Sequence, residues 1–271
     1  MKKLTIGCLV LMSAAAVADD EYILGDIVGK VNQAPKKEVG WNGDVSLGAN
    51  LKRGNVDSFA GDFAAHAKRR WIQQSWDING YVEYGKTDGE KSADSQKIDS
   101  TYRYDFSPRF FGFINGALSR DKVQLIKRNL LVTLGPGWRV WQNQQGRNYF
   151  DLEAGLGYEH KAFFRSPEDC DDAKACTRGE RSPTRNDFVG RAAFESKYHL
   201  WAVETTWNSE YIQPFTDANA FSANSTLQLA SPIAKNLFFT NAFRIDYEND
   251  PAEDSKKTDL TFTTGIKYQF N

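Results

Sequence analysis

The sequence predicts an all-β fold: a closed antiparallel transmembrane β-barrel of about twelve strands, connected as an up-and-down meander. Three observations predict it. Apolar and polar residues alternate in one segment after another, and shorter and longer connections alternate between these segments. No stretch after residue 18 reaches the roughly 20 apolar residues of a spanning helix. A chain without such a helix can cross lipid only as a closed barrel, because every backbone polar group there needs a partner.

The alternation is clearest over residues 41–51, 150–158 and 260–270. In each segment one face is apolar and free of charge, and many of these faces end in aromatic residues. This is the layout of a lipid-facing band with aromatic girdles at both interfaces. Residues 110–120 are ambiguous, because their phenylalanines fall on both faces.

The N-terminus has the pattern of a cleaved secretory signal peptide over residues 1–18. A pair of lysines precedes an apolar run, and Ala16-Val17-Ala18 has small residues at the positions that signal peptidase reads. We expect a periplasmic lead-in over 19–40 and the barrel over 41–271. Without the two lysines the chain has 34 − 2 = 32 basic and 35 acidic residues, a balance that does not suggest a nucleic-acid partner.

The connections predict the orientation of the barrel. The even-numbered connections are mostly shorter, and the longest connection, 166–186, is odd-numbered. Outer-membrane barrels have short periplasmic turns and longer extracellular loops. We therefore expect both ends of the chain in the periplasm.

Several glycine-aromatic motifs are shared with a known family. They are Gly40-Trp41-Asn42-Gly43, Leu134-Gly135-Pro136-Gly137-Trp138, the run from Leu152 to Tyr158, and the run from Thr264 to Phe270. Over nearly all of residues 40–271 the sequence resembles the YdiY-like family of salt-induced outer-membrane proteins. The resemblance implies an outer-membrane barrel of unknown molecular function, linked to salt stress, and it supplies no catalytic residues.

The last strand also resembles the signal read by the barrel-assembly machinery, through Thr263, Gly265, Tyr268 and Phe270. That machinery is therefore an expected partner during biogenesis. In the Gram-negative outer membrane the expected partners are lipids and lipopolysaccharide, with the barrel itself a monomer.

Charges of both signs fall on the polar faces. We expect a lumen charge network formed by Asp99, Arg103, Asp105, Arg139, Glu153, Arg191, Glu195, Glu204, Arg244 and Asp246. The sequence suggests that Arg103 pairs with Asp99 and Asp105, Arg139 with Glu153, Arg191 with Glu195, and Arg244 with Asp246. Buried charges need partners, so this balance favours a packed or narrow lumen. The alternative is a selective channel, in which rings of charge set the ion preference.

The remaining candidates for chemistry are few. Cys170 and Cys176 lie in the longest connection, and an oxidising compartment favours a disulfide over a metal pair. His66, His160 and His199 lie on different strands or turns, so we expect no catalytic site, metal or cofactor. Three function classes stand: a stress-linked envelope barrel, a narrow diffusion channel, and, as the enzyme alternative, a lipid-modifying barrel.

Overall fold

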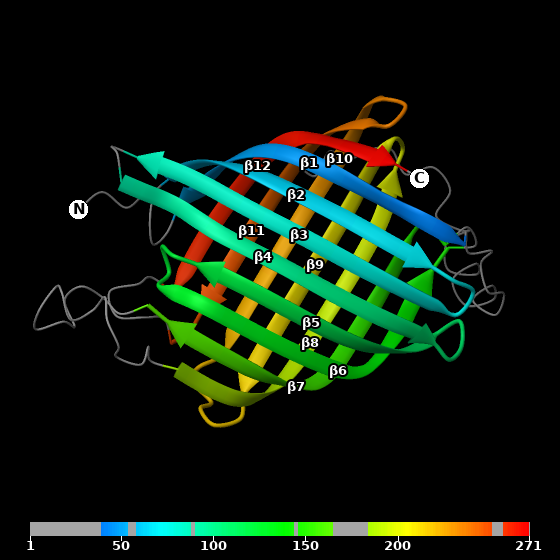
Figure 1. The fold of residues 1–271 in the computed structure, drawn as a ribbon. Helices are drawn as coiled ribbons and strands as arrows, with labels where there is room; N and C mark the ends of the chain where they lie inside the picture. Colours follow the sequence, from blue (N-terminus) through cyan, green and yellow to red (C-terminus); the bar gives the residue numbers. More distant parts are fainter. Residues whose placement is uncertain are drawn as a thin grey trace, which may run out of the picture.

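A computed structural model describes residues 39–53, 58–87, 90–143, 146–164, 184–250 and 257–270. Within these ranges twelve antiparallel strands form one closed barrel, in which each strand lies beside the next in sequence and β1 lies beside β12 (Figure 1). The strands are β1 (Gly40–Arg53), β2 (Ser58–Arg70), β3 (Gln74–Thr87), β4 (Glu90–Asp105), β5 (Phe110–Asp121), β6 (Ile126–Gln142), β7 (Tyr149–Phe163), β8 (Thr184–Leu200), β9 (Val203–Pro214), β10 (Ser222–Ala234), β11 (Leu237–Glu248) and β12 (Thr258–Phe270). The predicted fold is confirmed.

The seam between β1 and β12 closes the sheet. Gly43 pairs with Phe270 and Leu51 pairs with Phe262, in a continuous antiparallel register. The start of β1 and the end of β12 therefore lie at one end of the barrel, which we call the entry end. We call the opposite end, at which β7 ends and β8 begins, the far end. The expected signal peptide and most of the expected lead-in lie outside the described residues.

The outer surface of the barrel is apolar. Leu47, Leu134, Leu156 and Phe188 are among many large apolar side chains that are exposed there. A continuous apolar surface of this kind is unfavourable in water and matches the hydrocarbon layer of a membrane. No helix in the described residues is long and apolar enough to cross a membrane, a finding that does not bear on crossing by strands.

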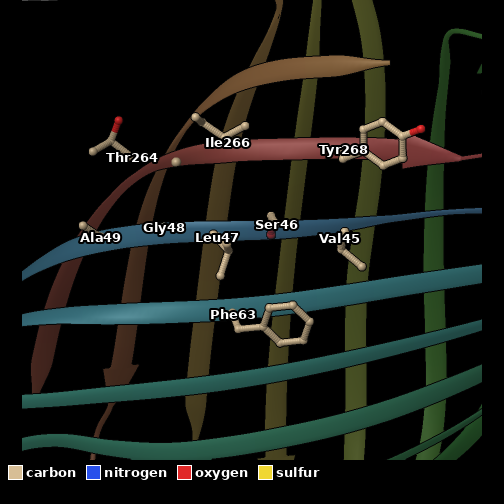
Figure 2. A pocket seen from close by; sticks show the side chains of 10 residues that line it. Val45, Ser46, Leu47, Gly48, Ala49, Phe63, Thr264, Ile266 and Tyr268 are labelled. Carbon is tan, nitrogen blue, oxygen red and sulfur yellow. The ribbon is translucent and has the colours of Figure 1, made fainter.

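The seam itself carries a shallow apolar hollow on the outer surface. Figure 2 shows Val45, Leu47, Phe63, Ile266 and Tyr268 around it, over β1, β2 and β12. The hollow lies outside the barrel and not in the lumen. Its lining is therefore part of the apolar outer surface of the barrel, which we call the apolar belt.

The structure shows which side chains of the ambiguous segment, residues 110–120, face the lumen. Phe110 points outward, whereas Phe111 and Phe113 are buried and face the lumen. They lie directly opposite Gly137 and Gly135 of β6. A methyl group on Gly137 would lie 2.1 Å from the Phe111 ring, so this glycine leaves the space that the ring fills. Large and small residues thus interlock on the inner wall.

A charge on the outer belt should destabilise the barrel according to its depth. Leu156 lies at the centre of β7 and is 63% exposed. Leu156→Arg should lower the free energy of unfolding in lipid vesicles by about 2–4 kcal/mol, the cost of a buried cation at the midplane. Leu200→Arg, at the end of β8, is the matched control and should cost about 0–1 kcal/mol. Equal costs in urea titrations would contradict the placement of the belt.

Candidate functional site

One arginine joins distant strands inside the barrel. Arg103 of β4 forms ion pairs with Glu153 (2.5 Å) and Asp151 (3.4 Å) of β7 and with Glu195 (2.8 Å) of β8. Its side chain passes over β5 and β6 to reach them. Asp151 is completely buried, so the contact is not a surface ion pair. Buried charges of this kind are stable only when each has a partner.

The two inward phenylalanines form the floor under these cations. The Arg103 guanidinium lies 4.8 Å from the Phe111 ring centroid, and that of Arg139 lies 5.7 Å from it. The Arg191 guanidinium lies 5.1 Å from the Phe113 ring. Cations over ring faces are attracted by the ring quadrupole, most strongly where water is excluded. The floor therefore orients the arginines as well as filling space.

Neighbouring arginines extend the network along the wall. Arg139 donates two hydrogen bonds of 3.0 Å to Asp151. Arg191 donates to Glu153 (2.7 Å) and to Glu210 of β9 (2.6 Å). The network therefore runs from β4 to β9. Shared carboxylates make its members interdependent.

Tyr149 also donates a hydrogen bond to Glu195, one of the carboxylates that Arg103 contacts. This neutral donor adds a partner to that carboxylate without adding charge.

A second contact crosses the lumen near the entry end. Lys267 of β12 lies 3.6 Å from Glu204 of β9, although β10 and β11 separate these strands along the wall. Glu204 also pairs with Lys197 at 2.7 Å and with His199 at 3.3 Å. One carboxylate thus links three cationic or potentially cationic side chains.

Two more contacts cross at the far end. Gln124, in the connection between β5 and β6, donates a hydrogen bond of 3.1 Å to Asp259 of β12. Lys161 of β7 lies 3.3 Å from Glu248 of β11. Side-chain contacts therefore span the lumen at both ends.

The structure places the charged residues of the expected network on the lumen side, and several of their pairings differ from those expected. Arg139 pairs with Asp151, its direct neighbour in register, rather than with Glu153. The ion pairs of Arg191 run to Glu153 and Glu210 rather than to Glu195. Arg191 and Glu195 are four residues apart on one strand, a separation of about 13 Å, whereas Glu153 and Glu210 lie on the neighbouring strands. Glu153 is only the diagonal neighbour of Arg139, whereas Asp151 is directly opposite and therefore closer.

The expected pairing is wrong for Arg103 but is found for Arg244. Arg103 reaches β7 and β8, while Asp99 accepts a hydrogen bond from Asn79 (3.0 Å) and Asp105 lies 3.9 Å from Arg139. Arg244 pairs with Asp246 at 2.7 Å, as expected.

The network also contains residues that sequence reasoning did not single out. Phe111 and Phe113 are the clearest, and the paired glycines of β6 are the signal that could have identified them. Tyr149, Asp151 and Glu210 alternate correctly for the lumen, but no sequence signal ranks them above other polar residues.

The histidines do not meet in one place. His66 lies between Asp44 and Asp77, at 3.2 Å from each. His160 is hydrogen-bonded to Asn186 (2.6 Å), and His199 is near Glu204. In the part of the chain that the structure describes, no group of three or more His, Cys, Asp or Glu is arranged to hold a metal ion. Cys170 and Cys176 lie outside the described residues, so their disulfide stays a prediction.

Comparison with protein families identifies one family that covers most of the chain. The family described as a protein of unknown function, DUF481, matches residues 45–270. The chain belongs to this family. The YdiY-like resemblance of the DUF481 chain is consistent with that match. No curated protein matches the chain.

Solved structures similar to this DUF481 chain are barrels of low sequence identity. The NanC porin has a TM-score of 0.50 and 8% identity, over 84% of this chain and 99% of the porin. The translocator domain of the autotransporter NalP from Neisseria meningitidis has a TM-score of 0.48 and 11% identity, over 88% and 91% of the two chains. The KdgM porin in complex with disordered oligogalacturonate has a TM-score of 0.44 and 10% identity, over 84% and 99%. The likeness to NanC extends to the fold alone.

Removal of the central cation should destabilise the barrel. Arg103→Ala leaves the buried Asp151 and Glu153 and the partly exposed Glu195 without their shared partner, and the free energy of unfolding should fall by about 3–5 kcal/mol. Arg109→Ala, in the exposed turn before β5, is the matched control and should change it by less than about 0.5 kcal/mol. Urea titration in lipid vesicles measures both. If the two variants unfold alike, the network has no structural role.

Proposed function

We propose that this DUF481 protein is a Gram-negative outer-membrane barrel whose lumen is held closed by ion pairs, with a structural or stress-linked role in the envelope. The apolar belt supports insertion in lipid, and the signal-like N-terminus supports export. The barrel-assembly machinery would insert the chain, and the lipids and lipopolysaccharide of the outer membrane would surround it. The link to salt stress is carried over from the family resemblance.

The observation that carries the closed lumen is the reach of Arg103 to three carboxylates on β7 and β8. A wide, water-filled pore screens its wall charges, so they need no such pairing. Here Arg103, Asp151 and Glu153 are instead paired with one another and largely withdrawn from solvent. The contact between Lys267 and Glu204 and that between Gln124 and Asp259 support closure at other heights.

Apolar packing supports the same conclusion. Leu131, Val189 and Ile212 form a small buried cluster on the inner wall, between β6 and β9. Val189 and Thr133 are fully buried although their strands form the wall of a barrel. This part of the lumen is therefore filled in the manner of a protein core.

A narrow channel is the second candidate, and one observation favours it. The side chain of Arg244 faces the lumen between the outward Phe243 and Ile245, yet it is 42% exposed. Open space thus remains beside β11. Small solutes or ions would pass there if the crossing contacts opened.

Conductance separates the two candidates. Purified wild-type protein in planar bilayers should show little or no steady current. Arg103→Ala should raise the current and favour cations, because it removes the crossing side chain and leaves three carboxylates facing the lumen.

Arg109→Ala should behave as wild type in the same bilayers. A large, steady wild-type current that Arg103→Ala does not change would favour the channel and contradict the closed lumen. Release of fatty acid from vesicles containing the wild-type protein would instead favour a lipid-modifying enzyme.

A further inference from the structure

Two acidic side chains face each other in the lumen outside the arginine network. Asp62 of β2 and Glu83 of β3 are directly opposed in register. They are only 9% and 5% exposed. Like charges that are directly opposed destabilise a sheet, and burial makes an unpaired charge costly. Such a pair is stable only with a counter-charge or a shared proton.

The described side chains do not supply that counter-charge. Glu83 accepts a hydrogen bond from Ser95 (3.1 Å) through Oε2, and the neutral hydroxyl of Tyr81 also lies beside it. Asp62 Oδ1 and Glu83 Oε1 have no hydrogen-bond partner among the described residues, and neither carboxylate forms an ion pair there. Arg244 approaches Glu83 from β11, but its guanidinium is bonded to Asp246 at 2.7 Å. The arrangement differs from that of Asp151 and Glu153, each of which meets two arginines.

A third polar group points to a ligand at the same place. Asn50 of β1 is 1% exposed, and its carbonyl oxygen has no hydrogen-bond partner within the described part of the chain. Its amide nitrogen is directed at the Asp62 carboxylate. A buried carbonyl oxygen without a partner is costly and rare in native proteins. A bound ion would use the unpaired oxygens of all three residues.

Gly48 leaves the space in which the Asp62 side chain can approach Asn50. It lies opposite Asp62 in register, and a methyl group on it would lie 2.7 Å from Asp62 Oδ1 and 3.0 Å from Oδ2. The Asp62 carboxylate therefore lies over the backbone of β1, two residues from Asn50. Only a glycine leaves this space open.

We propose that Asn50, Asp62 and Glu83 bind a hard divalent cation of the Ca²⁺ class inside the lumen. All three contribute oxygen atoms, the ligands that such ions prefer, and two carboxylates balance two positive charges. Ca²⁺ accepts irregular oxygen geometry, whereas Mg²⁺ demands a near-ideal octahedron that residues on three fixed strands do not readily form. The ion would replace repulsion between β2 and β3 by attraction. The inference does not depend on whether the lumen conducts.

The test is thermal unfolding of the refolded, full-length mature protein at constant ionic strength, with Ca²⁺ or with a chelator. Ca²⁺ should raise the Tm of the wild type saturably, and equilibrium dialysis should find one ion per barrel. Glu83→Gln should lose the Ca²⁺ shift. In chelator this variant should melt at or above the wild type, because one of two opposed charges is gone. Glu204→Gln, which alters a carboxylate already paired with lysines, should keep the full shift.

Gly48→Ala tests the site without changing any charge. By displacing Asp62 it should weaken Ca²⁺ binding by roughly 10- to 100-fold, as the loss of supporting groups does at other metal sites. The proposal is overturned if the wild type binds no Ca²⁺, or if Glu83→Gln keeps the shift. It is equally overturned if mild acid alone raises the wild-type Tm and Ca²⁺ does not, since the carboxylates would then share a proton.

Discussion

Closure of β1 onto β12 is the constraint from which the rest of this structure follows. Lipid offers no partners to backbone N–H and C=O groups, so a sheet can remain there only if its two edges pair with each other. The continuous register from Gly43–Phe270 onward achieves this. Once the sheet is closed, the period of two sends every second side chain into the lumen. The apolar belt and the charged interior are two consequences of the same closure.

The charged side chains that face the lumen then need partners of opposite charge. Arg103, Arg139 and Arg191 lie over the rings of Phe111 and Phe113 and share the carboxylates of β7 to β9. Ion pairs of this kind add little net stability compared with an apolar core, but loss of one member is costly. We therefore expect the network to specify one arrangement of the lumen. The acidic pair of Asp62 and Glu83 lies outside this arginine network, and we propose that a cation from solution neutralises it.

The fold could be predicted from the sequence because alternation, aromatic girdles and turn lengths are local signals. For the same reason, the alternation also predicted which side chains of most strands face the lumen and which face outward. The partners of each charge could not be predicted: Arg103 and Glu153 are 50 residues apart in the chain, and their contact depends on how far a side chain reaches across the curved wall. The role of Phe111 was hidden because three phenylalanines occur within four residues. Only the register against Gly137 shows which of them the barrel encloses.

A double-mutant cycle between Arg103 and Glu195 tests the central claim most directly. The two side chains come from β4 and β8, so their energetic coupling reports a contact across the interior. We predict that Arg103→Met and Glu195→Gln are coupled by about 0.5–3 kcal/mol in the free energy of unfolding in lipid vesicles. Effects that add within about 0.3–0.5 kcal/mol would mean that the two residues do not meet, and would contradict a lumen closed by ion pairs.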